Sequence, residues 1–210
     1  MLDKPDRILF ASTNAGKARE VGHMLRDFDV PVIQLGDVSF LPAPEETGVT
    51  FQDNADIKAL YYARASGLWT LADDSGLEVD ALGGAPGVHS ARYAGPTASD
   101  RDNNVKLIAA LIGIESWHRT ARFRCALALA RPDRIECRAQ GAVEGLIIDQ
   151  PRGDNGFGYD PHFFIPDLNL TLAELPPDRK NAISHRGQAL ARLRDELESR
   201  WRSGGNGRVA

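Results

Sequence analysis

Cysteine is scarce in this chain, which has two among 210 residues. Cys125 and Cys137 do not form a Cys-x-x-Cys pair, and no third or fourth ligand accompanies them, so a zinc site is not expected. The two cysteines lie on apolar segments that flank a turn at 131–133. In a reducing cytosol we expect both to be free, buried thiols.

Long apolar runs and an excess of positive charge are also missing. No apolar stretch approaches the roughly 20 residues that span a bilayer, and the N-terminal segment lacks the apolar core of a signal peptide. We therefore expect a cytoplasmic protein with no membrane partner. The chain has 25 basic and 29 acidic side chains, a formal net charge of −4. Because a broad nucleic-acid footprint needs a basic face, we expect no nucleic-acid partner, whereas a small anionic ligand is compatible with this charge.

What is present is the composition of a soluble globular protein, 42% hydrophobic and 26% charged, with enough residues for a sizeable core. Strand-like and helix-like segments alternate early, and a hairpin follows, so we expect an α/β fold with a mixed sheet. We expect one domain over 1–202 and a flexible glycine-rich tail over 203–210.

Hydrophobic periodicity and cap residues set the expected elements. Thr50, with Asp53 in the first turn, is expected to begin a helix that Gly67 ends. The expected strands are 7–11, 30–35, 68–72, 120–130, 134–148 and 162–165, and the expected helices are 15–27, 50–65, 99 or 100 to 112, and a single long helix over 181–201 with Ile183, Leu190, Leu193 and Leu197 as its apolar face.

Two adjacent carboxylates, Asp73 and Asp74, follow the apolar segment 68–72, and we expect a turn at Ser75 and Gly76. Neighbouring acids repel each other unless a cation lies close, and a divalent metal is the usual one. If the strand continues, the two side chains alternate faces, and only one points into a cleft. Plain turn chemistry is the other interpretation. The pattern makes this segment a candidate for metal-assisted chemistry on a phosphate.

The segment from Ser12 to Lys17 stands between a strand and a helix. Backbone N–H groups at a helix N-terminus attract anions, and Lys17 adds a positive charge. The spacing is not that of a P-loop, which needs a longer loop and a Lys followed by Ser or Thr. A capped helix with a surface lysine is the alternative.

Three further segments carry polar groups. Glu45 and Glu46 precede the second helix, and either approach a metal or are simply solvated. In 155–161, glycines flank Phe157, which can stack on a base or pack within the loop, while Asp160 can accept hydrogen bonds. The segment 180–186 supplies several donors, or is a solvated helix surface.

Taken together and in this order, the five segments resemble the inosine triphosphate pyrophosphatase family, whose bacterial members are called dITP/XTP pyrophosphatases. The motifs that carry the resemblance are 12–17, 46–51 with Asn54-Ala55 and Lys58-Ala59, 72–95, 156–161 and 184–186. The resemblance extends from Leu9 to about Leu190.

The resemblance implies an elongated α/β fold in which a mixed sheet is flanked by helices, with two lobes and a central cleft, assembled as a homodimer. It implies a Mg²⁺-dependent enzyme that hydrolyses the deaminated purine nucleotides ITP, dITP and XTP to the monophosphate and pyrophosphate, which keeps them out of DNA and RNA. By this resemblance Asp74 is the general base and a metal ligand, Glu46 is the second metal ligand, and Asp73 is a support. The implied triphosphate contacts are Ser12, Thr13, Asn14, Ala15, Gly16 and Lys17; Ser75 touches the substrate; and the base and sugar pocket is formed by Phe157, Gly158, Tyr159, Asp160, Lys180, His185 and Arg186.

Two other functions are weighed against this one. A nucleotide pyrophosphatase of the septum-formation inhibitor (Maf-like) type, acting on modified pyrimidine nucleotides, shares an early strand-to-helix phosphate site. The segment Ser184-His185-Arg186 argues against that type. A nucleotide-binding module without catalysis is the third possibility, and the carboxylates Asp73, Asp74 and Glu46 argue against it.

Overall fold

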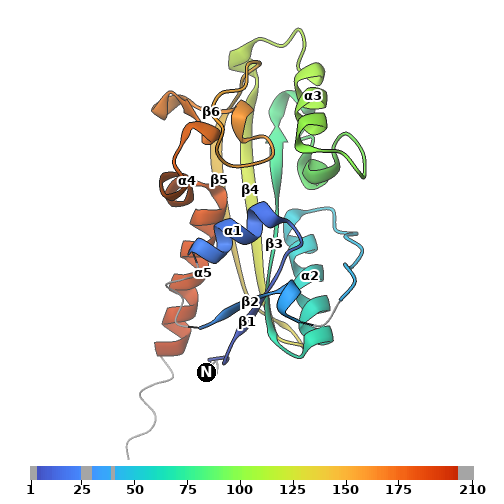
Figure 1. The fold of residues 1–210 in the computed structure, drawn as a ribbon, viewed down its shortest axis with the longest axis vertical. Helices are drawn as coiled ribbons and strands as arrows, with labels where there is room; N and C mark the ends of the chain where they lie inside the picture. Colours follow the sequence, from blue (N-terminus) through green and yellow to red (C-terminus); the bar gives the residue numbers. More distant parts are fainter. Residues whose placement is uncertain (1–3, 25–29, 39–40, 203–210) are drawn as a thin grey trace, which may run out of the picture. The chain divides into compact units, whose positions relative to one another are not determined.

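The computed structural model describes residues 4–24, 30–38 and 41–202. Within these ranges, seven strands form one sheet in the order β2-β1-β3-β4-β5-β6-β7 (Figure 1). The strands are β1 Ile8–Ala11, β2 Val32–Gln34, β3 Trp69–Val79, β4 Thr120–Ala130, β5 Ile135–Ile147, β6 Phe163–Ile165 and β7 Leu170–Thr171. The α-helices are α1 Ala15–Met24, α2 Phe51–Ser66, α3 Asp100–Ala110, α4 Pro177–Ile183 and α5 His185–Arg202. The sheet is parallel between β1 and its neighbours and antiparallel from β5 to β7, which confirms the expected mixed α/β sheet.

The chain packs as two compact units. Among the described residues, unit 1 takes the chain as far as Asp74, residues 126–140 and the chain from Arg186, and unit 2 takes residues 75–125 and 141–185. The strands β3, β4 and β5 therefore contribute residues to both. The expectation of a single domain over 1–202 stays a prediction, and the expected tail 203–210 lies outside the described residues. None of the helices in the described ranges has both the length and the apolar character needed to cross a membrane.

The centre of unit 1 is the parallel trio of β2, β1 and β3. Ile8 stands opposite Val32 on one side and Trp69 on the other, and all four residues of β1 are buried. A short, continuous apolar run is typical of a strand covered on both faces, which explains why 7–11 was recognisable from sequence. The expected helix 15–27 is seen as α1 as far as Met24, and 25–27 lie outside the described residues.

Helix α2 begins and ends where its cap residues predict. The Thr50 side chain accepts from the backbone N–H of Asp53, and the Asp53 carboxylate accepts from the backbone N–H of Thr50. Gly67 adopts φ +73° and ends the helix. Because only a residue without Cβ enters this region at no steric cost, Gly67 is a strong stop signal.

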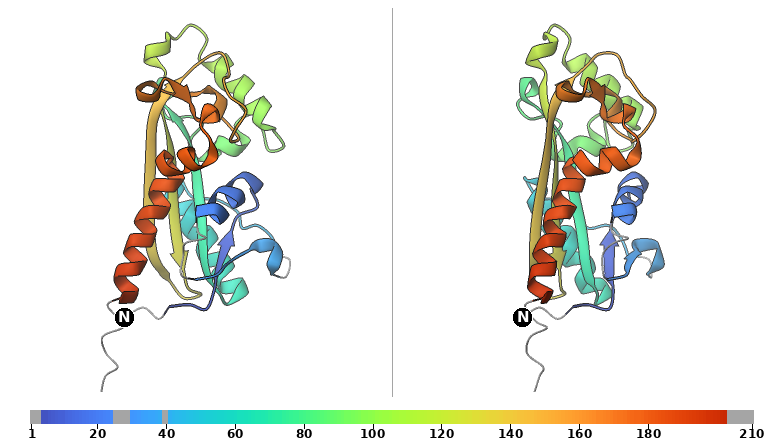
Figure 2. Two further views of the ribbon diagram at one scale, coloured as in Figure 1. Left: turned by 60° about the vertical axis from the view of Figure 1, so that its left-hand side comes forward. Right: turned by 90° about the vertical axis from the view of Figure 1, so that its left-hand side faces the viewer.

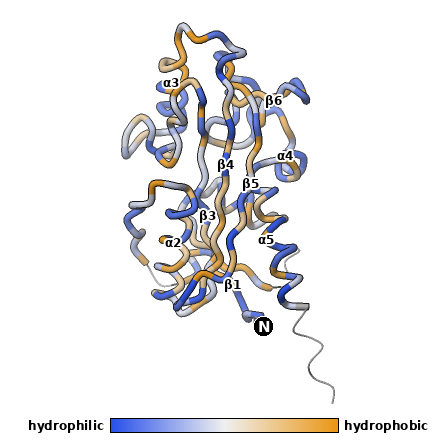
Figure 3. Tube along the Cα trace, turned by 180° about the vertical axis from the view of Figure 1, so that it is seen from behind, coloured by the Kyte–Doolittle hydropathy of each residue, from blue (hydrophilic) through white to orange (hydrophobic). Residues whose placement is uncertain are grey.

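Helix α5 runs alongside β5 within unit 1 (Figure 2). The guanidinium of Arg192 donates to the Gln140 carbonyl at 2.6 Å, and that of Arg200 donates to the Glu136 carbonyl at 2.8 Å. The expected apolar face is confirmed for Leu190, Leu193 and Leu197, all of which are buried. Figure 3 shows the corresponding alternation of hydrophobic and hydrophilic segments along α5.

The expected turn at Ser75 and Gly76 is wrong, because β3 continues through both residues to Val79. Gly76 is needed for a close approach instead. A Cβ on Gly76 would lie 2.3 Å from the Ser90 hydroxyl oxygen and 2.6 Å from the Gly87 carbonyl oxygen. The Ser90 hydroxyl also accepts from the Leu77 backbone N–H, at 2.9 Å. The glycine therefore admits the segment 87–90 against the strand, which the sequence pattern alone could not reveal.

The single helix expected over 181–201 is also wrong, because α4 and α5 are separated at Ser184. This residue is extended, with ψ 158°, and its N–H donates to the Lys180 carbonyl at 2.8 Å, which closes α4. Serine is a favoured residue at the point where a helix begins, and it stands directly before α5. The break means that Asn181 and His185 do not share one helix face.

The expected hairpin between β4 and β5 is confirmed: the backbones of Arg131 and Arg134 bond to each other, and the strands are neighbours in the sheet. Both cysteines on these strands are buried thiols, as expected.

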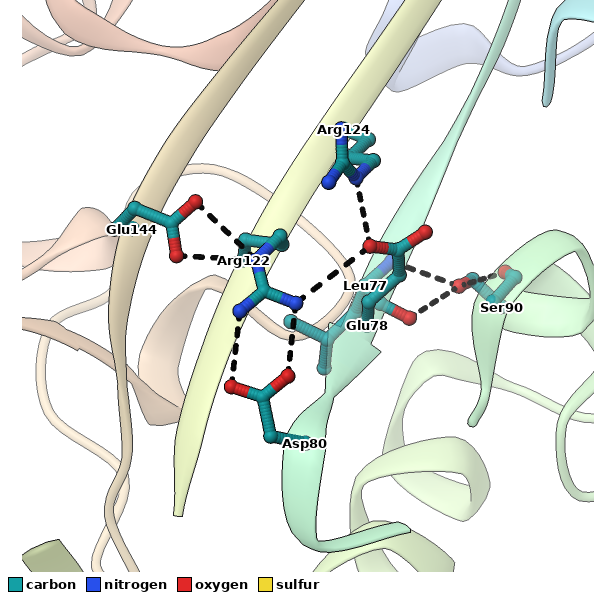
Figure 4. Close-up of polar contacts among 8 residues, drawn as sticks. Leu77, Glu78, Asp80, Ser90, Arg122, Arg124 and Glu144 are labelled. Carbon is teal, nitrogen blue, oxygen red and sulfur yellow. Dashed lines mark hydrogen bonds and ion pairs between the residues drawn. The ribbon is translucent and has the colours of Figure 1, made fainter. Parts of the chain in front are cut away.

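A ladder of charged side chains links β3, β4 and β5 in unit 2 (Figure 4). Two nitrogens of Arg122 donate to the two oxygens of Asp80 at 2.8 and 2.9 Å, and its Nε donates to the Glu144 carboxylate. Arg124 donates to Glu78 at 2.7 Å. The hydrogen bonds from Arg122 lower the pKa of Asp80 and raise the pKa of Arg122.

Arg122→Ala is expected to lower the free energy of unfolding by about 1 kcal/mol at neutral pH, the upper end for an exposed pair, because Arg122 links two carboxylates. The folded pKa of Asp80 is below its unfolded value of about 4, so this stabilisation is complete above pH 4 or so and is lost as pH falls through the folded pKa. Urea unfolding at pH 7 and pH 3 measures the difference. An equal loss for Arg194→Ala, whose nearest carboxylate oxygen is 3.8 Å away, would contradict the assignment.

Candidate functional site

The adjacent carboxylates Asp73 and Asp74 point to opposite faces of β3 and bind different cations. Asp74 binds Lys58 of α2, with 2.7 Å between Oδ1 and Nζ. Asp73 binds Lys17 of α1 and Arg186 of α5. The alternation expected of a continuing strand is therefore confirmed, and the two acids are given unequal surroundings.

On one face of β3, Lys58 brings two carboxylates together. Its Nζ lies 2.7 Å from Asp74 and 3.4 Å from Oε1 of Glu46, and all three side chains are at least partly buried. Burial raises the pKa of Asp74, and the positive charge of Lys58 works against that rise. Burial also acts to lower the pKa of Lys58, but the charges of Asp74 and Glu46 outweigh it and raise that pKa. The arrangement is a strongly charged cluster held out of bulk water.

The donor set on this face fits Mg²⁺. Two carboxylates from different segments converge on one cation, the ammonium of Lys58. Mg²⁺ is usually held by one or two carboxylates together with waters and substrate phosphates, rather than by a complete protein cage. No cluster of three or more His, Cys, Asp or Glu that could hold a metal occurs in the described part of the chain.

The segment from Ser12 to Lys17 forms a hydrogen-bonded turn that leads into α1. The Asn14 side chain accepts from the backbone N–H of Lys17 at 3.0 Å, and the Ser12 hydroxyl accepts from the backbone N–H of Asn14 at 3.2 Å. Thr13 is exposed, Gly16 is buried, and Ala15 is the first residue of α1. The ammonium of Lys17 is held by Asp73. The helix cap is therefore present, but Lys17 is not a surface lysine, because its side chain is 14% exposed and paired with Asp73. The implied contact of this segment with a triphosphate stays a prediction.

Arg186 belongs to the same cluster in unit 1. Only 1% of this residue is exposed, its Nε donates to Asp73 at 2.9 Å, and a terminal nitrogen pairs with Glu20 of α1. The guanidinium thus bridges two carboxylates. Its implied contact with a nucleotide base stays a prediction.

In unit 2, three of the implied base-pocket residues form one group. The Asp160 carboxylate accepts from the backbone N–H of Phe157 at 2.8 Å and from Nζ of Lys180 at 2.6 Å. The same Nζ lies 5.0 Å from the centre of the Phe157 ring. Gly156 permits this arrangement, since a Cβ there would lie 2.1 Å from an Asp160 oxygen. Lys180 and Asp160 are a buried ion pair that fixes the aromatic ring beside a cation.

The remaining implied residues differ in their surroundings. His185, at the start of α5, stacks on Phe123 of β4, with ring centres 4.9 Å apart and planes at 11°. The Tyr159 hydroxyl donates to the Ser90 carbonyl at 2.8 Å, and burial raises its pKa. Tyr159 therefore anchors the loop in the core of unit 2. Ser75 directly follows Asp74 in β3 and is half-buried.

Sequence reasoning gave no role to Lys58, Asn54, Glu20 or Phe123. Asn54 and Lys58 are four residues apart on α2, so they share a helix face, and both approach Asp74. Glu20 lies three residues after Lys17, again on one face of a helix. These spacings are visible in the sequence, but nothing in the sequence says which face of each helix meets β3.

Comparison with known proteins shows which family the chain belongs to. A family model described as the Ham1 family matches residues 8–196, and the chain belongs to that family. A protein named dITP/XTP pyrophosphatase from Methylococcus capsulatus is 51% identical over 195 residues, 92% of this chain and 96% of that protein. One from Geobacter sulfurreducens with the same name is 49% identical over 191 residues, covering 91% and 96%.

Solved structures give the same relationship. A HAM1 protein from Coxiella burnetii is 45% identical, with a TM-score of 0.84 over 92% of this chain and 98% of that one. The Ham1 protein of Staphylococcus aureus is 41% identical, with a TM-score of 0.81 over 92% and 99%. The expected family and fold class are confirmed.

Proposed function

We propose that this protein is a nucleoside triphosphate pyrophosphatase that hydrolyses ITP, dITP and XTP to the monophosphate and pyrophosphate. The observation that carries the proposal is the buried Asp74, which together with Glu46 contacts Lys58. The chain is also about 50% identical in sequence to proteins named dITP/XTP pyrophosphatase. The reaction would remove deaminated purine nucleotides from the pool used for DNA and RNA synthesis.

The triphosphate is proposed to bind in unit 1. Its negative charges need cations, and Lys17 and Lys58 pair with the adjacent carboxylates Asp73 and Asp74, with Lys17 close enough for its charge to act on Asp74 as well. The turn at Ser12 and Asn14 and the N-terminus of α1 add hydrogen-bond donors for phosphate oxygens. Bound Mg²⁺, held by Asp74 and Glu46, would neutralise phosphate charge and orient the phosphates.

Asp74 is proposed to act as the general base. Its carboxylate takes a proton from a water molecule as the water oxygen attacks the α-phosphorus. The bond between the α-phosphorus and the oxygen that bridges to the β-phosphorus breaks, and pyrophosphate leaves with that oxygen. Burial raises the pKa of Asp74, and the positive charge of Lys58, 2.7 Å away, works against that rise by favouring the ionised carboxylate. Lys17 stabilises the charge that develops on the phosphates.

The base is proposed to bind to the residues of unit 2, with the Phe157 ring as a stacking surface. Hypoxanthine and xanthine present an oxygen acceptor at position 6, where adenine presents an amino donor. Donors from Lys180 or His185 would pair with that oxygen. Adenine would set donor against donor and leave buried groups unpaired, which is costly.

The decisive measurement is pyrophosphate release from ITP, dITP, XTP, ATP, GTP and UTP with Mg²⁺. We expect kcat/KM for ITP to exceed that for ATP by roughly 100-fold, the effect of one or two mismatched buried hydrogen bonds. Chelation of the metal with EDTA is expected to stop hydrolysis, and added Mg²⁺ to restore it.

Three outcomes would overturn the proposal. Equal rates on ITP and ATP would show that the protein does not select deaminated purine nucleotides over ATP. A preference for UTP or methylated pyrimidine nucleotides would favour the Maf-like alternative, which the similarities above do not support. Tight ITP binding without hydrolysis would favour a binding module. A homodimer in the cytoplasm is part of the same proposal, and sedimentation of the purified protein tests the dimer.

A further inference from the structure

Helix α3 holds the backbone of Gly158 in the loop that presents Phe157. The N–H of Gly158 donates to the Asp100 carboxylate at 2.8 Å, and the amide of Asn104 donates to the Gly158 carbonyl at 2.9 Å. Asp100 and Asn104 are four residues apart, so they share one face of the helix. One helix face thus satisfies both backbone polar groups of a single loop residue. These two side chains are called the α3 clamp.

The Asn104 amide donates to Gly158, but its own oxygen, the buried Oδ1, is left without a hydrogen-bond partner in the described part of the chain. Rotating the amide by half a turn would place that oxygen against the Gly158 carbonyl oxygen, so the amide is fixed in the donating orientation. An apolar side chain would avoid the unpaired oxygen. The feature that favours Asn here is therefore the bond to Gly158.

Apolar packing and polar contacts divide the loop between them. Tyr159 lies in the same hydrophobic cluster as Leu107 of α3. Beside it is a cavity of about 800 Å³, lined by Val105 of α3 and by Phe157 of the loop. At Gly158 the polar groups of helix and loop are joined by the two hydrogen bonds of the clamp.

Gly158 sits inside the turn that positions the proposed base-binding groups. The N–H of Asp160 donates to the Phe157 carbonyl at 3.3 Å, and the Asp160 carboxylate accepts from the Phe157 N–H. Gly158, between them, has φ +63°, a conformation that side chains disfavour. Fixing both of its backbone groups fixes the peptide planes on either side, and with them Phe157 and the pair of Asp160 with Lys180.

We infer that Asp100 and Asn104 are positioning residues for base recognition: the α3 clamp sets the stacking surface of Phe157 without touching the nucleotide. This inference rests on the proposed function, because it assigns the clamp to the base-binding half of that activity. The inference assigns base binding to the loop held by the clamp, and it leaves phosphate binding to the residues of unit 1.

The test compares four single variants, and the double variant of Asp100→Ala with Asn104→Ala, with the wild type. Asp100→Ala and Asn104→Ala each remove one bond, and Asp100→Asn keeps an oxygen that can accept from Gly158. Asp102→Ala is the matched control, because it removes an acidic first-turn side chain and the bonds that its carboxylate accepts from the Ser99 N–H and hydroxyl, but none to Gly158.

We expect Asp100→Ala and Asn104→Ala to raise the KM for ITP and the dissociation constant of IMP about tenfold each, with kcat changed less than about twofold. The inhibition constant of pyrophosphate, which lacks the base, stays unchanged. Asp100→Asn and Asp102→Ala stay within about twofold of the wild type. The double alanine variant is little worse than either single one, because both bonds hold one residue. Hydrogen exchange of the Gly158 amide is expected to become faster in Asp100→Ala and to stay unchanged in Asp100→Asn and Asp102→Ala.

Failure of the inference and failure of the proposed function look different. Wild-type protein that neither hydrolyses ITP nor binds IMP would overturn the proposed function, and the base-binding role of the clamp with it. Intact ITP hydrolysis with unchanged IMP affinity in both alanine variants would overturn the clamp alone. So would an equal loss in Asp102→Ala, an equal loss of pyrophosphate affinity, or unchanged exchange of the Gly158 amide in Asp100→Ala.

Discussion

Asp74→Asn is expected to lower kcat for ITP by about 100- to 10,000-fold, the usual contribution of a positioned general base. The amide keeps the size of the carboxylate but cannot take a proton from water, and it is a poor ligand for Mg²⁺. The KM for ITP is expected to change much less, since Lys17 and the turn at Ser12 still bind phosphate. Pyrophosphate release under saturating ITP measures kcat, and the urea midpoint monitors the fold.

The adjacent aspartate provides the matched control. Asp73 lies in the same strand but binds Lys17 and Arg186, so Asp73→Asn is expected to affect stability and phosphate binding more than the chemical step. Turnover of Asp74→Asn near the wild-type level would refute the assignment of the base. If Asp73→Asn lowers kcat as much as Asp74→Asn does, with phosphate affinity preserved, the assignment of the general base to Asp74 is wrong.

Arg186→Met is expected to lower the free energy of unfolding by about 3 to 5 kcal/mol, the effect of removing one partner from a buried ion pair. The Asp73 side chain is 0% exposed and the Arg186 side chain 1%, and Glu20 is a second partner of the guanidinium. Removing Arg186 leaves these two carboxylates with less compensating charge. Urea unfolding of the variant, beside Arg194→Met on the exposed face of α5, measures the loss.

A double substitution separates charge compensation from lost packing. If buried negative charge is the cause, Asp73→Asn in the Arg186→Met background is expected to recover part of the lost stability. A further loss in the double variant would contradict this cause. The KM for ITP, measured well below the unfolding transition, then tests the implied contact of Arg186 with the base: an unchanged KM would remove Arg186 from the base pocket.

Much of the fold was predictable because local signals agreed with the tertiary structure. The buried strand β1, the cap residues Thr50 and Gly67 of α2, and the leucines of α5 each behave as their local pattern indicates. The opposite orientations of Asp73 and Asp74 followed from the period of a strand, whereas their different roles are implied by the family resemblance.

The first error arose because a local turn pattern was outweighed by a contact distant in sequence, and the second because a helix break was missed. Ser75 and Gly76 are residue types that favour turns. In the structure, however, a glycine is needed at position 76 because Ser90 and Gly87 lie against it. The helical pattern over 181–201 is continuous, yet Ser184 is extended, and the chain begins a new helix there.

The sequence by itself determined the family and the mixed α/β class, because these depend on residue types and their order, and it predicted candidate residues for the chemistry. The tertiary structure alone decided the partners of those residues. It brought Lys58 to Asp74 and Glu46, gave Asp73 to Lys17 and Arg186, and set Asp100 and Asn104 around Gly158. Pairings of this kind depend on which helix face meets which strand, and the packing of distant segments fixes that choice.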